Sequence, residues 1–194
     1  MARDIRLVFG PLGMVILLVA VVGLACLVPG YSQVRQTVSE IGEVGSPMQM
    51  PFTLALCVVA ACLLVFAAGL WRTSRFGAGL VAAMAASAAG VGVFAFPHPL
   101  HNVFGLSELI GYQAPLAFAL TLGRDPDRRG LSRFCWIMFA LVWVAIALNL
   151  SSLARGEFWA MVKPVYGLVQ RALFAAWFAW AGWLGWSLWR RQTP

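Results

Sequence analysis

The sequence predicts an all-α membrane protein, a polytopic bundle of six transmembrane helices with both termini in the cytoplasm. Of its 194 residues, 61% are hydrophobic and only 11% are charged, whereas soluble domains contain about 25% charged residues. The hydrophobic residues form long runs, as in segments whose solvent is lipid. The basic residues are concentrated in alternate connecting loops, which is the usual signal of membrane topology.

Six apolar runs each reach the roughly 20 residues that a helix needs to cross a hydrocarbon core. Backbone groups in lipid must find partners within their own segment, so we expect each run to be a helix. The runs leave no room for a separate soluble domain, and residues 1–194 form a single transmembrane domain. The expected spans are residues 7–28, 50–71, 76–96, 102–122, 132–153 and 166–189.

The placement of charge predicts the orientation of these spans. Six spans put ten arginines on one side of the membrane, and only Arg35, Arg155 and Lys163 lie in loops on the other side. This asymmetry follows the positive-inside rule and places both termini in the cytoplasm of a bacterial inner (plasma) membrane protein. We therefore interpret the net charge of +7 as a topology signal with membrane lipids as partners, and exclude nucleic acid. The ten arginines are Arg3, Arg6, Arg72, Arg75, Arg124, Arg128, Arg129, Arg133, Arg190 and Arg191.

Two of the spans have a distinctive composition. The third is rich in Gly, Ala and Ser, which let helix backbones approach closely, so we expect it to be the most buried helix. The sixth contains regularly spaced tryptophans, which we expect to form a lipid-facing belt near the cytoplasmic interface. These tryptophans are Trp177, Trp180, Trp183, Trp186 and Trp189.

Only two charged residues fall well inside a span, Glu108 in the fourth and Arg171 in the sixth. Intramembrane charges are costly and mark functional candidates. Each lies about 10 Å below the outer end of its helix at 1.5 Å per residue. Equal depth and opposite charge predict an ion pair or a shared polar pocket. The pair would serve either as part of a site or as a salt bridge that joins two helices.

Helical periodicity extends this polar pocket. His101, Gly105, Glu108 and Tyr112 follow a 4-3-4 spacing and so share one face of the fourth span. The first outer loop and the start of the sixth span add polar residues on the same side of the membrane. The catalytic candidates are His101, Glu40, Glu108 and Ser39, and the ligand-binding candidates are Arg171, Gln170, Tyr166, Tyr112 and Asn102.

A metal centre is not expected. Zinc needs about three protein ligands, and the only histidines, His98 and His101, are separated by Pro99, which constrains their geometry. We predict neither a metal nor another cofactor.

A Ser-His-acid hydrolase is a second chemical option. Its nucleophile would be Ser39 or Ser107, its base His101, and its acid Glu40 or Glu108. No nucleophile-elbow motif accompanies these residues, so the sequence permits this chemistry without selecting among them.

Several short motifs, in order along nearly the whole chain, resemble a known family. They are Pro29-Gly-Tyr31, Thr37-Val-Ser-Glu-Ile-Gly42, Phe96-Pro97, His101 at the start of the fourth span, and Tyr166-Gly-Leu-Val-Gln-Arg171. This pattern resembles the six-span prokaryotic membrane proteins catalogued as domain of unknown function 998, and the first loop is distantly similar to the eukaryotic Frag1/DRAM/Sfk1 membrane proteins. The resemblance implies a six-span fold but no activity. It also implies that five residues occupy recurrent polar positions: Ser39, Glu40, His101, Gln170 and Arg171.

The resulting hypothesis is an integral membrane protein whose polar pocket, near the outer leaflet, binds a lipid or amphiphile and, if it is an enzyme, hydrolyses or modifies it. Arg171 would bind an anionic headgroup, Glu108 would orient it, and His101 with Glu40 would exchange protons. One alternative is an accessory or scaffold subunit that binds a membrane-protein partner. Another is a small transporter, for which we would expect broken helices near the bilayer midplane.

Overall fold

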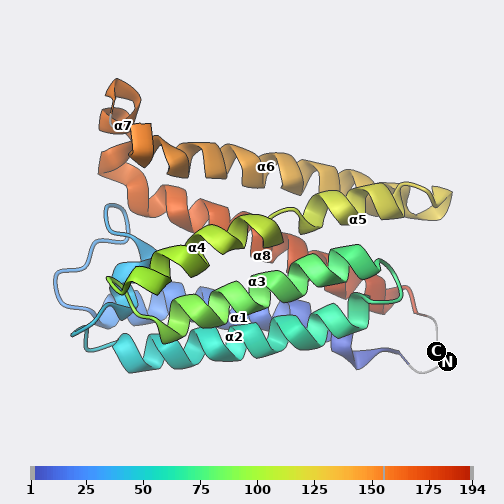
Figure 1. Ribbon diagram of the computed structural model, residues 1–194. Coiled ribbons are helices and arrows are strands. Elements are labelled where there is room, and N and C mark those ends of the chain that lie inside the picture. Colours follow the sequence, from blue (N-terminus) through green and yellow to red (C-terminus); the bar gives the residue numbers. More distant parts are fainter. Residues whose placement is uncertain (1–2, 155, 193–194) are drawn as a thin grey trace.

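The computed structural model describes residues 3–154 and 156–192, and all regular structure within these ranges is helical. Figure 1 shows the long helices lying side by side in an elongated bundle. The long elements are α1 (Phe9–Gly23), α2 (Gln49–Leu70), α3 (Arg75–Val93), α4 (Pro99–Gly111), α5 (Ala114–Leu122), α6 (Arg129–Ala154) and α8 (Tyr166–Arg190). The short ones are η1 (Ile5–Val8), η2 (Leu24–Leu27), η3 (Val38–Gly42), η4 (Pro126–Arg128), α7 (Glu157–Val162) and η5 (Lys163–Val165).

The helices confirm the prediction of an all-α membrane protein. Five helical segments of the described chain are long and apolar enough to cross a membrane: Ile5–Leu27, Gln49–Leu70, Arg75–Val93, Pro99–Leu122 and Pro126–Ala154. Among them Arg75–Val93 has the largest buried share, 56%, as its small residues predict. Helix α8 is long enough at 25 residues, but it is less apolar than these five, and the sixth span stays a prediction.

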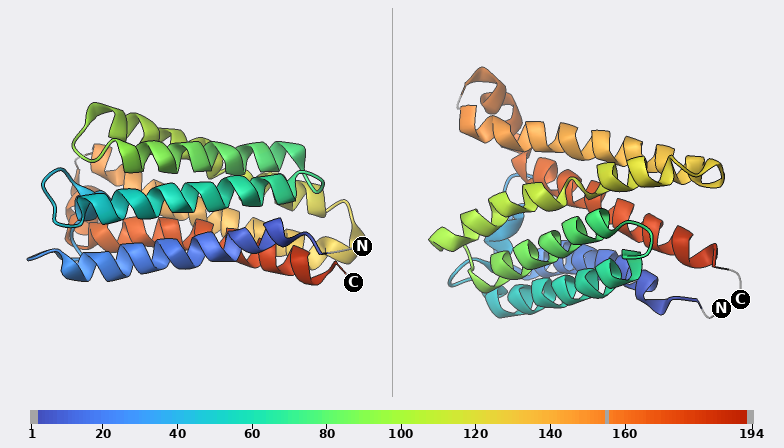
Figure 2. Two further views of the ribbon diagram at one scale, coloured as in Figure 1. Left: turned by 90° about the horizontal axis from the view of Figure 1, so that it is seen from below. Right: turned by 45° about the vertical axis from the view of Figure 1, so that its right-hand side comes forward.

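The long helices form a closed ring. Helix α1 packs on α2 and α8, α2 packs on α3, and α3 packs on both α4 and α5. Helix α5 then packs on α6, and α6 on α8, which returns to α1. Figure 2 shows the same bundle from two further directions. The last helix is therefore a neighbour of the first.

The fourth predicted span is broken between α4 and α5, whereas a single helix over residues 102–122 was expected. The break follows from Pro115, which has no amide hydrogen to donate to the carbonyl of Gly111 four residues earlier. The indole Nε1 of Trp177 on α8 donates to that carbonyl instead, at 3.0 Å. A buried carbonyl needs a partner, and α8 therefore stabilises the break.

The tryptophans of α8 divide between two environments, so the predicted lipid-facing belt is wrong for part of the set. Trp177 and Trp180 are fully buried, while 54% of Trp183 and 39% of Trp186 is exposed. The helix packs on both α1 and α6, and its tryptophans are spaced three residues apart. Such a row drifts around the helix from one face to another, which takes the first two residues into the core.

The two ends of the bundle differ in charge. At one end, Arg3 Nε donates to the carbonyl of Gln192 at 3.0 Å, which brings the first and last described residues together. The α2–α3 and α5–α6 turns lie at the same end (Figure 1), and we call it the arginine end because the ten arginines named above belong to these segments. The opposite end, which we call the loop end, contains residues 28–48, residues 94–98 and α7. Which end faces the cytoplasm stays a prediction.

Candidate functional site

The first loop, residues 28–48, contains the short helix η3, which is held by a capping box. Thr37 donates from its backbone nitrogen and from its hydroxyl to Oε1 of Glu40, each at 2.8 Å. The side-chain amide of Gln36 donates from Nε2 to Oε2 of the same carboxylate at 2.8 Å. Such reciprocal caps satisfy the free amides of a helix start. Glu40 therefore accepts hydrogen bonds within the loop through both oxygens.

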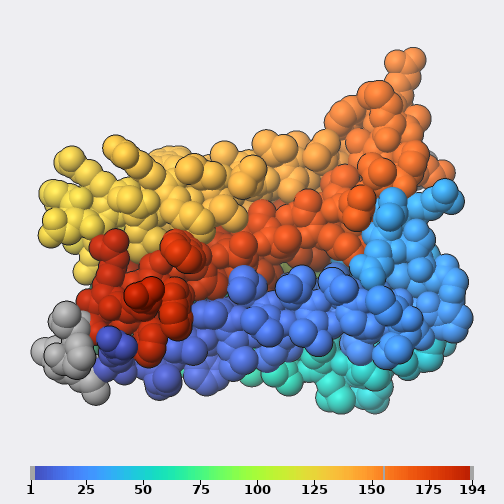
Figure 3. Space-filling model, turned by 180° about the vertical axis from the view of Figure 1, so that it is seen from behind, coloured from blue at the N-terminus to red at the C-terminus, as the bar shows by residue number. Residues whose placement is uncertain are grey.

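Helix α8 anchors this loop through the motif Tyr166–Arg171. The side chain of Gln170 accepts a hydrogen bond from the amide of Val38 at 2.5 Å. The absence of a side chain at Gly167 lets the loop backbone lie directly on the helix, because a Cβ there would stand 2.6 Å from the carbonyl of Gln33. Figure 3 shows the first loop, in light blue, against the start of α8, in orange. Two motifs distant in sequence are thus in direct contact.

Arg171 completes the anchor with its guanidinium group. Nη1 donates to the carbonyls of Gln36 at 3.1 Å and Gly167 at 3.0 Å, and Nη2 donates to the hydroxyl of Tyr31 at 2.7 Å. The Tyr31 hydroxyl donates in turn to the carbonyl of Thr37 at 2.7 Å. Burial raises the pKa of Tyr31 above its ordinary value, although the hydrogen bond from Arg171 acts in the opposite direction.

The predicted ion pair between Glu108 and Arg171 is wrong. Glu108 accepts a hydrogen bond from the hydroxyl of Tyr112 at 2.9 Å. The ion pairs within the described residues, Arg6–Asp4 and Arg128–Asp125, both lie at the arginine end. Helical spacing placed the two groups at one depth, but the guanidinium turns toward the loop, where the carbonyl of Gln36 and the hydroxyl of Tyr31 accept its hydrogen bonds. Its Nε is buried with no hydrogen-bond partner among the described residues.

Ser39 and His101 form a hydrogen-bonded pair that joins η3 to α4. The Ser39 Oγ lies 2.9 Å from Nε2 of His101, and Nδ1 of His101 lies 2.8 Å from the carbonyl oxygen of Phe94. A carbonyl oxygen only accepts, so Nδ1 donates to it. In the neutral ring Nε2 is then the acceptor for the Ser39 hydroxyl. His101 is only 7% exposed, and both ring nitrogens have partners other than Glu40.

The alternative nucleophile, Ser107, lies elsewhere on α4. Its Oγ is 2.7 Å from Oγ of Ser87 on α3 and donates to the carbonyl of Phe104 at 2.7 Å. The sequence named Ser39 among the catalytic candidates and Ser107 as another possible nucleophile, and the geometry brings Ser39 to the histidine.

A small cavity of about 40 Å³ adjoins Ser39. Its polar walls are Ser39 and Glu108, and its other walls are apolar side chains from α1, α2, α3 and α8. A cavity of this size has room for about one water, which also needs at least two polar partners. The apolar walls include Leu17, Phe52, Leu56, Met84, Phe174 and Phe178.

Three other predicted residues have separate environments. Tyr166 packs edge-on against Trp159 with ring centroids 5.0 Å apart, and the side chain of Asn102 is exposed. His98 caps α4, where its Nδ1 accepts from the amide of Leu100 at 3.1 Å. Within the described part of the chain, no three His, Cys, Asp or Glu side chains gather as a metal ion would require.

The candidate residues chosen from the sequence did not include three residues that take part in these hydrogen bonds: Tyr31, Gln36 and Phe94. Tyr31 lies in the Pro29-Gly-Tyr31 motif, which was the one available signal for its importance. Phe94 acts through its backbone carbonyl, as Gln36 does toward Arg171, and every residue type possesses this group. Gln36 also donates from its side chain to Glu40. The sequence therefore had no means of distinguishing Phe94, and the role of Gln36 toward Arg171 was equally hidden.

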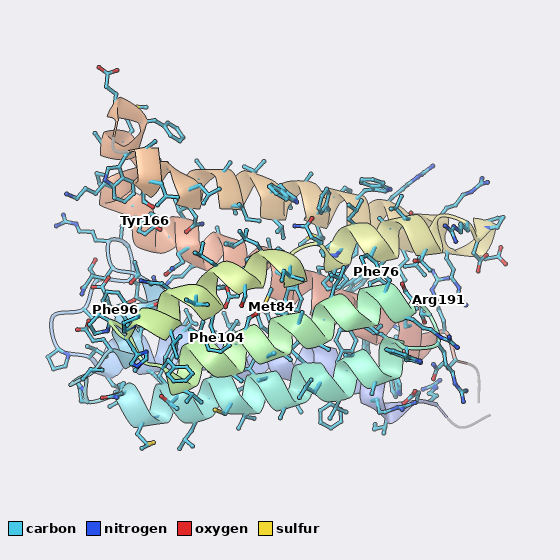
Figure 4. The ribbon with its side chains drawn as sticks, in the orientation of Figure 1. Phe76, Met84, Phe96, Phe104, Tyr166 and Arg191 are labelled. Carbon is cyan, nitrogen blue, oxygen red and sulfur yellow. The ribbon has the colours of Figure 1, made fainter. Side chains whose placement is uncertain are left out.

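Figure 4 shows Phe96 and Phe104 at the loop end, with Tyr166 at the start of α8 and Arg191 at the opposite end. The quoted motifs thus meet around the first loop, whose Val44 amide donates to the Phe96 carbonyl at 2.8 Å. No curated protein and no solved structure matches the chain. The family model described as "Protein of unknown function (DUF998)" matches residues 11–187. This match covers most of the chain, which therefore belongs to the DUF998 family of membrane-helical proteins.

Proposed function

We propose that this protein is a membrane-embedded hydrolase that cleaves an ester bond in a lipid or another amphiphile, with Ser39 as nucleophile and His101 as general base. The observation that supports this proposal is the 2.9 Å contact between Ser39 Oγ and His101 Nε2, together with the 2.8 Å contact that orients the ring. A nucleophile, a base within hydrogen-bond reach and a third group that orients the base are the parts of an activated serine.

The proposed reaction follows from these contacts. Ser39 Oγ attacks the ester carbonyl carbon while Nε2 of His101 accepts the hydroxyl proton. The bond from the carbonyl carbon to the alkoxy oxygen breaks, and His101 returns the proton to the leaving alcohol. Water then attacks the acyl-serine, with His101 again accepting a proton, and the products are a carboxylic acid and regenerated Ser39. The carbonyl of Phe94 keeps Nδ1 protonated throughout.

The surroundings of Ser39 support an amphiphilic substrate. The cavity beside it is too small for an acyl chain, since about 40 Å³ holds roughly one water. In the proposal this cavity therefore holds the attacking water, next to Glu108, and the substrate approaches Ser39 from the lipid. Gln170 and Arg171 position Ser39 indirectly by holding the first loop, in place of the headgroup-binding role expected for Arg171.

The proposal is tested with a fluorophosphonate serine probe and with vesicles that contain a fluorogenic ester phospholipid. Wild type and the matched control Ser107→Ala should react with the probe and release the fluorophore. Ser39→Ala should lose labelling, and His101→Gln should lower turnover at least about a thousandfold. If purified wild type neither labels nor turns over any ester, the proposal fails.

The second candidate is a non-enzymatic accessory subunit, and one observation favours it. Glu40, Gln170 and Arg171 each make side-chain hydrogen bonds that hold the first loop, as a purely structural motif would. In this case Ser39→Ala and His101→Gln would lower the melting temperature of the protein without changing any reaction. Measuring Tm beside probe labelling therefore separates the two candidates.

A further inference from the structure

A second, larger cavity lies at the arginine end and belongs to no part of the proposed hydrolase. It measures about 390 Å³ and opens between η1, the α2–α3 turn, the α5–α6 turn and the end of α8. Figure 4 shows its Arg191 at the end of the bundle opposite Phe96 and Tyr166. The lining residues are Leu7, Thr73, Asp125, Asp127, Arg128, Leu188, Arg191 and Gln192.

The two arginines in this cavity have donors to spare. Arg128 Nε lies 3.0 Å from a carboxylate oxygen of Asp125, and Arg191 Nη1 donates to the carbonyl of Asp127 at 3.1 Å. These contacts fix the two side chains from different elements, η4 and the end of α8. A guanidinium has five N–H donors, and each of these uses one in the contacts that the structure describes. Most donors of both groups are thus available to a ligand between them.

The charge around the cavity favours an anion. Ten arginines belong to this end of the bundle, and its three acidic residues are Asp4, Asp125 and Asp127. Asp4 pairs with Arg6 at 2.7 Å, and Asp125 pairs with Arg128. The Asp127 carboxylate also lines the cavity and forms no ion pair within the described residues, so the lining has two aspartates and two arginines. The excess positive charge comes from the other arginines of this end. The remaining field is positive and attracts anionic groups from the adjoining water or membrane surface.

Aromatic side chains place this cavity at the level of lipid headgroups. Arg3 stacks over the ring of Trp189 at 4.8 Å, and Arg190 lies over Trp186 at 5.9 Å. Tryptophan and arginine side chains gather where a bilayer meets water, because their apolar bodies and polar groups suit both phases. These pairs belong to the same end of the bundle as the cavity but do not line it. A cavity at this level can be entered by a headgroup from the membrane or by a solute from the water.

We propose that this cavity binds a phosphate group between Arg128 and Arg191. Two guanidinium groups fit the oxygens of a phosphate through charge-assisted, forked hydrogen bonds. The hydroxyl of Thr73 and the amide of Gln192 line the same cavity and supply further donors. The phosphate belongs either to a phospholipid headgroup or to a soluble phosphate compound, since both present the same oxygens.

The test compares a double variant with a control of equal charge. Arg128→Ala/Arg191→Ala removes the two cavity arginines. Arg75→Ala/Arg133→Ala removes two exposed arginines of the same end that do not line the cavity. Each protein is purified and exchanged into phosphatidylglycerol micelles for native mass spectrometry. In parallel, Tm is followed as inorganic phosphate is added in a phosphate-free detergent.

Wild type and the control should retain a bound phosphatidylglycerol, and the double variant should bind it at least about tenfold more weakly, because it loses charge-assisted hydrogen bonds. If wild type and the control retain no lipid, but inorganic phosphate raises their Tm and not that of the double variant, the bound phosphate belongs to a soluble compound. Equal behaviour of all three proteins in both assays overturns the proposal. An equal loss of lipid or phosphate binding in the double variant and the control also overturns the proposal, because the general positive charge of this end would then explain the binding.

Discussion

The contact of the first loop with α8 depends on Gly167, and the substitution Gly167→Ala tests it. The new Cβ would stand 2.6 Å from the carbonyl oxygen of Gln33 and 3.0 Å from the carbonyl carbon of Val34, and it would also contact the carbonyl oxygen of Gln36. All three are backbone atoms, so no side-chain rotation relieves the clash. The loop segment must therefore move away from the helix.

The cost can be worked out from the contacts that move with the loop. Forcing a methyl group into a packed contact costs about 1–3 kcal/mol. Displacement also weakens the bonds from Val38 N to Gln170 and from Arg171 to Gln36, each worth about 0.5–1.5 kcal/mol. Alanine has a better helix propensity than glycine, which offsets about 0.5–1 kcal/mol of this cost. We expect the loop to be destabilised by about 2 kcal/mol, roughly a 30-fold rise in its open population.

Hydrogen–deuterium exchange of the peptides covering residues 31–42 measures this population. Gly79→Ala is the matched control, because a Cβ at this exposed helical position of α3 meets no atom within 4 Å. We expect faster exchange of the loop peptides in Gly167→Ala alone, with α2 and α3 unchanged. If the loop exchanges at the wild-type rate in Gly167→Ala, then the loop is not held by α8 and the reasoning is refuted.

Three further predictions concern Trp177, Tyr31 and Glu40. Trp177→Phe leaves the carbonyl of Gly111 without its indole donor and should destabilise the protein by about 1–3 kcal/mol, seen as a lower Tm. The pKa of Tyr31 is raised in the folded protein, so its contribution is present below the unfolded pKa near 10 and is lost as the pH rises through the folded value. The Tm of wild type should then fall more steeply than that of Tyr31→Phe as the pH rises above about 10, and parallel curves would contradict this. Glu40→Ala removes the capping box around Thr37 and should cost about 0.5–2 kcal/mol, whereas Glu43→Ala, outside the box, should leave Tm unchanged.

The membrane fold was accessible from sequence because lipid imposes a simple requirement on every span. An apolar run must satisfy its backbone internally, so run length alone predicts a helix. The expected spans agree with α2 and α6 to within a few residues. The break before Pro115 was missed because its stability depends on a donor from α8, and run length contains no information about tertiary partners.

The candidate site was only partly predictable for a related reason. Helical periodicity correctly placed His101 and Tyr112 inside the bundle, where both are buried. Periodicity predicted how deep each residue lies along its helix and which face of the helix it occupies. It could not predict the direction in which the long side chain of Arg171 turns. That direction depends on the course of an irregular loop, and the carbonyls that receive the guanidinium carry no residue-specific signal. The sequence therefore identified which residues take part in the polar contacts better than it identified which of them contact each other.

The anchoring of the first loop by the last helix has a consequence for biosynthesis. Val38 and Gln170 are 132 residues apart in the chain, and Tyr31 and Arg171 are 140 apart. Membrane helices are made in order from the N-terminus, so the loop leaves the ribosome long before α8 exists to receive it. Long-range contacts of this kind form late in folding. The first loop therefore becomes anchored only once synthesis is nearly complete, and a chain interrupted before α8 would lack the contacts that hold the loop and its Ser39 in place.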